Sequence, residues 1–358
     1  MKSLQSLDTR GNDIYILERL FDTNSNLKLI YSDNFALCCI TPKMMPADGC
    51  IAPPFDVSSC TTLIESDILC TFLWIIGILA VVGNICVFIS RIKNEEGLFH
   101  DTFSILVGNL SVADSLIGVY LISIGIANEF LRGKYIWKEY GWRNSLHCSA
   151  LGILSVLSSQ VSVLTISFLT VARYLAVKFP FKEHKISRKN AIFGCVTIWM
   201  VSLIMGLFPY FAIENYYSVS GVCLSLPLTK HKRTGWLYSF LLFVVFNFLS
   251  FLFIAFAQAP IIHEVKKISS QVELSGKSKH IKVAKRLSLV ILTDCLCWIP
   301  IGTMGLMVMF GYDMPRVIYA WTVVFVLPIN SAINPFLYTF SDSKYKEFCQ
   351  KIVKKRNI

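Results

Sequence analysis

Seven long apolar stretches dominate this chain, at about 68–90, 102–127, 148–172, 190–212, 237–262, 287–308 and 318–340. Each is long enough to cross a bilayer, which takes about 20 apolar residues. The stretches contain no Lys or Arg and only two acidic residues, Asp114 and Asp294. Because a charge at the middle of a bilayer costs several kcal/mol, this exclusion predicts an all-α membrane protein built as a seven-helix bundle.

Composition excludes a soluble fold. Hydrophobic residues make up 54% of the 358 residues and charged residues only 16%, against about a quarter charged in an average soluble domain. A soluble protein of this length could not bury so much apolar surface in one core.

Basic residues outside the stretches predict the orientation. The segments after the first, third and fifth stretches, together with the C-terminal tail, hold 21 of the 34 Lys and Arg residues. The positive-inside rule then places the N-terminus outside the cell. The net charge of +11 therefore lies mostly on the inner face, where it suits anionic membrane lipid and an acidic partner. No motif indicates a nucleic-acid partner.

Residues 1–63 form the predicted outer segment. Leu4-x-x-Leu7, followed by Asn12, is echoed by Leu27-x-x-Ile30, with the 20–29-residue spacing of leucine-rich repeats. A polar tail with chance leucines is the alternative. A Cys-rich hinge follows, and its four cysteines allow three disulfide pairings between which the sequence does not choose, Cys38, Cys39, Cys50 and Cys60.

The remaining organisation is simple. Residues 64–340 form the bundle, with loops too short for a further domain, and 341–358 form a basic cytoplasmic tail. The tail is expected to begin with a short amphipathic helix on the inner leaflet, with Cys349 as a weak lipidation candidate. The first 30 residues contain no apolar run typical of a signal peptide. We therefore expect the first span to direct insertion, or the true N-terminus to lie upstream.

Short patterns fall at particular depths in six of the seven spans. They are Gly83-Asn84, Leu110-Ser111-x-x-Asp114, Ala172-Arg173-Tyr174, Trp199, Cys297-Trp298-Ile299-Pro300 and Asn334-Pro335-Phe336-Leu337-Tyr338. In order and depth this set resembles the rhodopsin-like G-protein-coupled receptors. The sequences 246–250, 293–300 and 327–335 more narrowly resemble the leucine-rich-repeat hormone receptors, most of all the relaxin receptors, with the glycoprotein-hormone receptors as the nearer competitor.

A carboxylate at mid-membrane needs polar partners, and the candidates for Asp114 are Asn84, Ser162, Asn330 and Asn334. The resemblance implies that Asp114, Ser162, Asn330 and Asn334 bind a sodium ion, which stabilises the inactive state. The alternative is a protonated Asp114 that is hydrogen-bonded to Asn334 without an ion. No other cofactor is expected.

The resemblance also implies an activation switch, formed by Asp294, Trp298, Pro300, Asn334, Pro335 and Tyr338. Pro300 and Pro335 each remove a backbone hydrogen bond and can kink their helices. A kinked span can act as a hinge, although prolines are common in membrane helices.

At the inner end of the third span, the resemblance implies that Arg173 and Tyr174 contact a G protein. The sequence departs from the family pattern here, since Ala172 replaces the usual acidic neighbour and Gln258 stands where many members have a tyrosine. We therefore expect raised basal signalling or altered coupling. The family also joins Cys148 to Cys223 by a disulfide over the bundle mouth. Free thiols are the alternative.

No phosphate loop, HExxH or GxSxG motif is present, so an enzyme is not expected. The resemblance implies a plasma-membrane receptor for a relaxin-like peptide hormone, which activates heterotrimeric G proteins and signals through cyclic AMP. A truncated or non-signalling isoform is the alternative, because the outer segment is short for a repeat array. A transporter is disfavoured, because the spans hold only two acids and show no inverted repeat.

Overall fold

The computed structural model describes residues 4–12, 21, 26–42, 45–46, 48–53, 57–93, 101–179, 186–228, 234–271, 278–312 and 314–339. Inside the helices, the side chains of 262, 264–271, 278–291, 294–295 and 338–339 are not described. The predicted tail helix and Cys349 lie outside the described residues.

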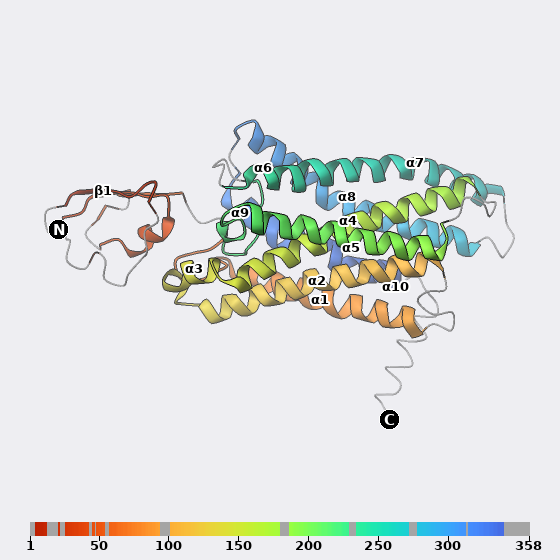
Figure 1. Ribbon diagram of the computed structural model, residues 1–358, viewed down its shortest axis with the longest axis horizontal. Helices are drawn as coiled ribbons and strands as arrows, with labels where there is room; N and C mark the ends of the chain where they lie inside the picture. Colours follow the sequence, from red (N-terminus) through yellow and green to blue (C-terminus); the bar gives the residue numbers. More distant parts are fainter. Residues whose placement is uncertain are drawn as a thin grey trace, which may run out of the picture.

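Seven helical spans lie side by side (Figure 1). They are α1 (Asp67–Lys93), α2 (Thr102–Leu131), α4 (Leu146–Lys178), α5 (Arg188–Ala212), the continuous α6 (Trp236–Ser239), η4 (Phe240–Phe246) and α7 (Asn247–Gln271), then α8 (Ser278–Met309), and finally α9 (Arg316–Trp321), η5 (Thr322–Val326) and α10 (Ile329–Thr339). Six spans are long and apolar enough to cross a membrane, and α8 carries the shorter apolar helix Leu296–Met309. The predicted seven-helix membrane bundle is confirmed.

Polar residues just outside the apolar stretches begin three of these helices. The side chains of Asp101, Ser145 and Ser187 accept hydrogen bonds from backbone N–H groups in the first turns of α2, α4 and α5, which otherwise have no partner within the helix. Several helices extend beyond the predicted stretches, and α4 continues to Lys178. The apolar pattern ends where the helix leaves the bilayer core, while the helix itself does not.

Two spans contain π-helical segments. The segment η4 precedes Asn247 in the fifth span, and η5 interrupts the seventh, where Leu327 N donates to Thr322 O at 2.9 Å. Such wide turns occur frequently at functional sites. In the fifth span, which lacks a mid-span proline, η4 supplies the irregularity.

The N-terminal segment forms a small unit beyond one end of the bundle (Figure 1). Its three short strands, β1 (Ser6–Asp8), β2 (Leu29–Tyr31) and β3 (Cys50–Ile51), pair in parallel in the order β1-β2-β3. Ser6 pairs with Leu29, so the strands follow the spacing of the leucine pattern. A separate small core supports them, formed by Phe21, Leu27, Ile30 and Leu37.

Two disulfides settle the pairing that the sequence left open. Cys38, in the 3-10 helix η1 (Phe35–Ile40), bonds to Cys50, and Cys39 bonds to Cys60. The adjacent cysteines of one short helix therefore tie it to β3 on one side and to the segment that enters the bundle on the other.

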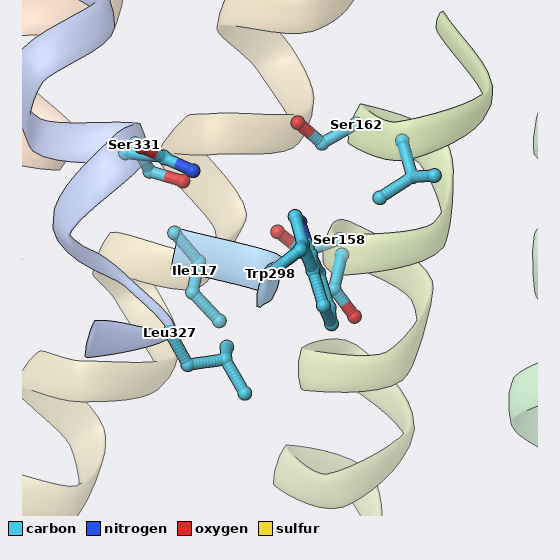
Figure 2. Close-up of a pocket in the computed structure, with 9 residues that line it drawn as sticks. Ile117, Ser158, Ser162, Trp298, Leu327 and Ser331 are labelled. Carbon is cyan, nitrogen blue, oxygen red and sulfur yellow. The ribbon is translucent and has the colours of Figure 1, made fainter. Parts of the chain in front are cut away.

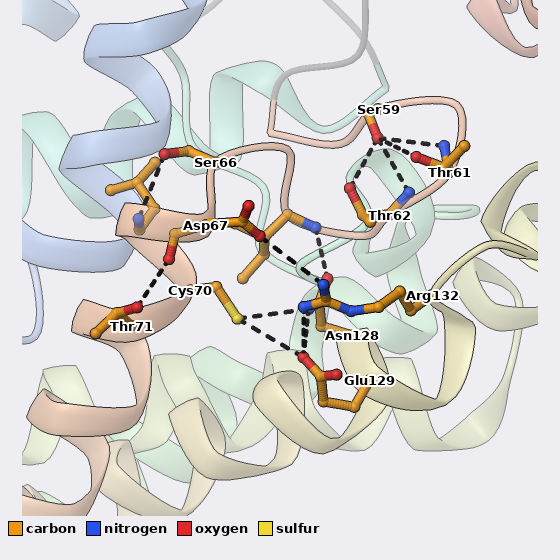
Figure 3. A network of polar contacts seen from close by, with 12 residues as sticks. Ser59, Thr61, Thr62, Ser66, Asp67, Cys70, Thr71, Asn128, Glu129 and Arg132 are labelled. Atoms are coloured by element: carbon orange, nitrogen blue, oxygen red, sulfur yellow. Dashed lines mark hydrogen bonds and ion pairs between the residues drawn. The ribbon is translucent and has the colours of Figure 1, made fainter.

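Residues 57–66 pack onto one end of the bundle, which they form together with α3 (Tyr135–Arg143) and residues 213–228. We call this end the mouth. Leu63 and Ile64 are fully buried, and Ile64 N donates to Asn128 Oδ1 at 2.9 Å. A polar network around Asn128 joins Cys70, Glu129 and Arg132 (Figure 3). Residues 57–66, the end of the Cys-rich hinge and the start of the bundle, thus contact α1 and α2 directly.

Candidate functional site

A buried carboxylate lies at the centre of the bundle. Asp114 on α2 is 1% exposed, and three side chains from two other spans donate hydrogen bonds to it. Asn334 Nδ2 lies 2.8 Å from Oδ2, whereas the Ser331 and Ser162 hydroxyls lie 2.9 and 3.3 Å from Oδ1. One acidic side chain therefore joins α2, α4 and α10.

A small cavity of about 20 Å³ lies beside this cluster, which is room for about one water molecule or ion of similar size. Figure 2 shows Trp298 against the cavity and the Ser162 hydroxyl pointing inward from α4. The lining residues come from four spans, Ile117, Ser158, Ser159, Ser162, Val163, Trp298, Leu327, Asn330 and Ser331.

The donor set fits a hard cation, which prefers oxygen ligands. It comprises a carboxylate and two hydroxyl groups, and Asn334 Oδ1 is buried with no hydrogen-bond partner in the described part of the chain. One carboxylate opposite three neutral polar groups suits a monovalent ion.

Two predicted partners of Asp114 make other contacts. Asn84 Nδ2 donates to the Ser331 backbone carbonyl at 2.8 Å, and Asn330 Oδ1 accepts from the Cys297 thiol at 3.2 Å. Ser331, which donates to Asp114, was not among its predicted partners. Its position three residues before Asn334, on the same helix face, was the signal that could have found it.

The switch residues lie close to this cluster. Trp298 is 7% exposed and lies two residues before Pro300 inside α8, while Pro335 lies inside α10. A Cβ atom at Gly83 of α1 would come within 2.9 Å of the Pro335 ring, so this glycine allows close packing of the two spans. Asp294 and Tyr338 belong to α8 and α10, but their side chains lie outside the described residues.

Arg173 and Tyr174 lie near the end of α4 opposite the mouth, and both are half-buried. Lys178 Nζ donates to the Tyr174 hydroxyl at 2.6 Å. Ala172 packs against the main hydrophobic core. An acidic side chain at that position would therefore lie between the core and the basic end of the helix.

At the mouth, a disulfide joins Cys148, at the start of α4, to Cys223. The loop around Cys223 is buried rather than draped over the surface, since residues 220–228 are all buried. Tyr120 donates to Val222 O at 2.7 Å, and Trp142 donates to Gly221 O at 2.7 Å. The chain's own loop therefore fills the mouth.

Tyr217 fixes the base of this loop. Its hydroxyl donates to Gly206 O on α5 at 2.6 Å. Burial raises the pKa of Tyr217 well above its ordinary value, so the hydroxyl remains protonated and keeps its hydrogen bond.

Comparison with known proteins agrees with this geometry. The family model described as 7 transmembrane receptor (rhodopsin family) matches residues 83–338. G-protein coupled receptor GRL101 of Lymnaea stagnalis is 34% identical over 331 residues, covering 92% of this chain and 29% of that protein. Relaxin receptor 2 of Canis lupus familiaris is 32% identical over 345 residues, with 94% and 46% covered, and relaxin receptor 1 of Mus musculus is 33% identical over 335 residues, with 91% and 43% covered.

The chain thus spans less than half the length of these relatives. The family model covers most of the chain, including the carboxylate cluster, Pro300 of α8 and the end of α4. The chain therefore belongs to the rhodopsin family of seven-transmembrane receptors.

Proposed function

We propose that this chain is a plasma-membrane receptor for a relaxin-like peptide hormone and that it activates heterotrimeric G proteins. The observation that carries the proposal is the carboxylate cluster beside the cavity that Trp298 lines, next to the proline-containing helix α8. The relatives named as relaxin receptors support the hormone class.

The distribution of basic residues supports an outside N-terminus. In that orientation the mouth faces the hormone, and Arg173 and Tyr174 face the cytoplasm. A G-protein α subunit would then contact the end of α4 and the basic segments around it, and its activation would change the level of cyclic AMP.

The filled mouth bears on how a hormone acts. Because residues 220–228 occupy it, we propose that a peptide acts by shifting this loop and residues 57–66. The hinge reaches the loop through α3, since Ser58 donates to the Tyr135 hydroxyl at 3.1 Å and α3 contacts the loop through Trp142. The hinge and the loop therefore form one connected path into the bundle.

We propose that the ion is sodium. In our proposal Asp114, Ser162, Asn330 and Asn334 surround it, with Ser331 as a further hydroxyl. The ion would supply a positive charge that holds α2, α4 and α10 together in the resting state. Without it, Asp114 is held by three hydrogen bonds from the protein alone.

The test is a cyclic AMP assay in cells that express the full chain, with surface expression measured in parallel. We expect cyclic AMP to differ from that of mock-transfected cells and to change further with relaxin-like peptides. Arg173→Ala should abolish both effects at equal surface expression. A chain at the surface that changes cyclic AMP neither alone nor with peptide would support the non-signalling alternative. Ion or solute flux in cells without G proteins would support a transporter.

A further inference from the structure

Three buried polar side chains on three different spans have no hydrogen-bond partner among the residues that the structure describes. Gln160 on α4 and Ser202 on α5 are 0% exposed, and Asn247 on α7 is 1% exposed. Both amide atoms of Gln160, both of Asn247 and the Ser202 hydroxyl make no hydrogen bond within the described structure. None of these atoms belongs to the Asp114 cluster.

Gln160 and Ser202 face each other across the α4–α5 contact. Gly206 lies against Ile153, and Gly194 lies against Phe168, so these pairs fix how the two helices run past one another. Gln160 falls about midway between the two α4 contacts, and Ser202 falls between the two glycines. Spacings of seven and eight residues on α4, and of eight and four residues on α5, keep Gln160 and Ser202 on the facing stripes.

Asn247 lies where the fifth span packs against two others. Val244 and Phe248, on either side of it, lie against glycines of α8, Gly305 and Gly302. Asn247 itself is 1% exposed, and α7 packs against α4 as well as against α8.

Asn247 also lies at the depth of Gln160. Gly152 of α4 and Ser239 of α6 lie at a similar depth near the mouth, because they contact two adjacent residues. Tyr217 lies against Gly152, and the Tyr216 and Ser239 hydroxyls are 2.9 Å apart and hydrogen-bonded. Gln160 and Asn247 each follow eight residues farther along spans that run in the same direction. Ser202 lies four residues below Gly206, which accepts the Tyr217 hydrogen bond. All three side chains are thus within about one or two turns of one layer.

The Ser202 hydroxyl contrasts with other hydroxyls in the spans. Ser111, for example, is also 0% exposed but donates to Val107 O of its own helix at 2.9 Å. Ser202 leaves its own helix carbonyl unused and remains without a partner. Unpaired polar atoms inside a membrane bundle cost free energy, and buried polar groups that lack protein partners are typically bonded by internal water.

We propose that Gln160, Ser202 and Asn247 form a water-binding site that joins α4, α5 and α7. Water is the ligand that suits the site, because two amides and one hydroxyl offer both donors and acceptors and carry no charge. The bound water completes hydrogen bonds between the three spans. None of its three residues lines the cavity beside Asp114.

The first test is whether Ser202→Ala raises or lowers the melting temperature of the purified full chain in lipid nanodiscs. If water bonds to the Ser202 hydroxyl, Ser202→Ala removes a satisfied group, and the melting temperature should fall by about 2–4 °C. If the site is dry, the same change removes an unpaired group and the melting temperature should rise or stay constant, which would overturn the proposal. Ser111→Ala is the matched control and should shift the melting temperature less, since the lost bond lies within one helix.

The second test detects water directly and needs no variant to establish the signal. A short X-ray pulse converts bound water to hydroxyl radicals, which oxidise adjacent side chains that mass spectrometry can map. We expect oxidation at Phe251, one turn from Asn247 and 7% exposed, and its loss in the triple variant Gln160→Leu, Ser202→Ala, Asn247→Leu. Absence of this label in the unmodified chain, or its persistence in the triple variant, would overturn the proposal in favour of direct side-chain contact.

Discussion

Asn334 on α10 donates a 2.8 Å hydrogen bond to Oδ2 of Asp114 on α2. Ser331, one turn earlier on α10, donates to Oδ1 at 2.9 Å. Both oxygens of one carboxylate thus bind the seventh span to the second, so the charge on Asp114 controls how these spans pack. The charge state and any bound cation should therefore influence the resting conformation.

The first prediction concerns sodium. Replacing choline chloride with sodium chloride at constant ionic strength should raise the melting temperature, because an ion that binds only the folded state stabilises it by about 1.4 kcal/mol at ten times its Kd. Asp114→Asn should abolish this difference. Asp67→Asn is the matched control, since the Asp67 side chain is 91% exposed at the start of α1. A sodium effect that survives in Asp114→Asn would contradict a site at this carboxylate.

The second prediction concerns basal signalling. Ala172→Glu should lower basal cyclic AMP, because an acidic side chain next to Arg173 at the end of α4 restrains the arginine that we propose contacts the G protein. Ala172→Gln has nearly the same size without the charge and should leave the basal level closer to that of the native chain. Equal basal levels in all three proteins, at equal surface expression, would refute this role of Ala172.

The bundle itself could be predicted because a membrane imposes a strong rule on sequence. Charges are excluded from each span, so the seven stretches are visible without any contact information. The ends of the helices were harder to predict from the sequence. The helix α4, for example, continues through Arg173 to Lys178, beyond the end of its apolar stretch. A helix that projects from the bilayer no longer needs apolar side chains on every face.

Contacts between distant segments could not be predicted from local pattern. The pairing of Cys38 with Cys50 depends on how β3 folds back onto η1. The burial of residues 220–228 depends on small residues elsewhere, such as Gly152 on α4, which lies against Tyr217 and Cys223 O. The unpartnered Asn247 likewise becomes notable only once its surroundings are known.

The third prediction tests the loop in the mouth. A Cβ atom at Gly152 would overlap the Tyr217 ring and the Cys223 carbonyl, so Gly152→Ala should displace the loop. We expect a lower melting temperature and a changed basal cyclic AMP level. Gly141→Ala in α3 is the control, because nothing lies within 4 Å of a Cβ atom there, and alanine in a helix is neutral or slightly stabilising. If both variants behave like the native chain, residues 217–223 do not pack on α4 as described.

The final prediction compares two ion pairs of very different burial. Glu139 and Arg143 of α3 form an ion pair in which the Glu139 side chain is 3% exposed and the Arg143 side chain 25% exposed, and Arg143 Nε also donates to the Ser218 carbonyl. Removing one partner of a fully buried pair costs about 3–5 kcal/mol, since the other charge is left without compensation. Because Arg143 retains some contact with solvent, Glu139→Ala should cost less than that, with release of the loop that carries Ser218.

Asp8 and Arg10 provide the contrast. The hydrogen bond from Arg10 lowers the pKa of Asp8 to about 2, which by itself suggests a strong interaction. Their side chains are, however, 49% and 58% exposed, and solvent screens such pairs so that many contribute nothing measurable. Asp8→Ala should therefore leave the melting temperature unchanged, whereas Glu139→Ala lowers it and Glu139→Gln, which keeps a hydrogen-bonding group, lowers it less. Equal effects of Asp8→Ala and Glu139→Ala would show that burial does not set the strength of these pairs, and that α3 does not hold the loop through Arg143.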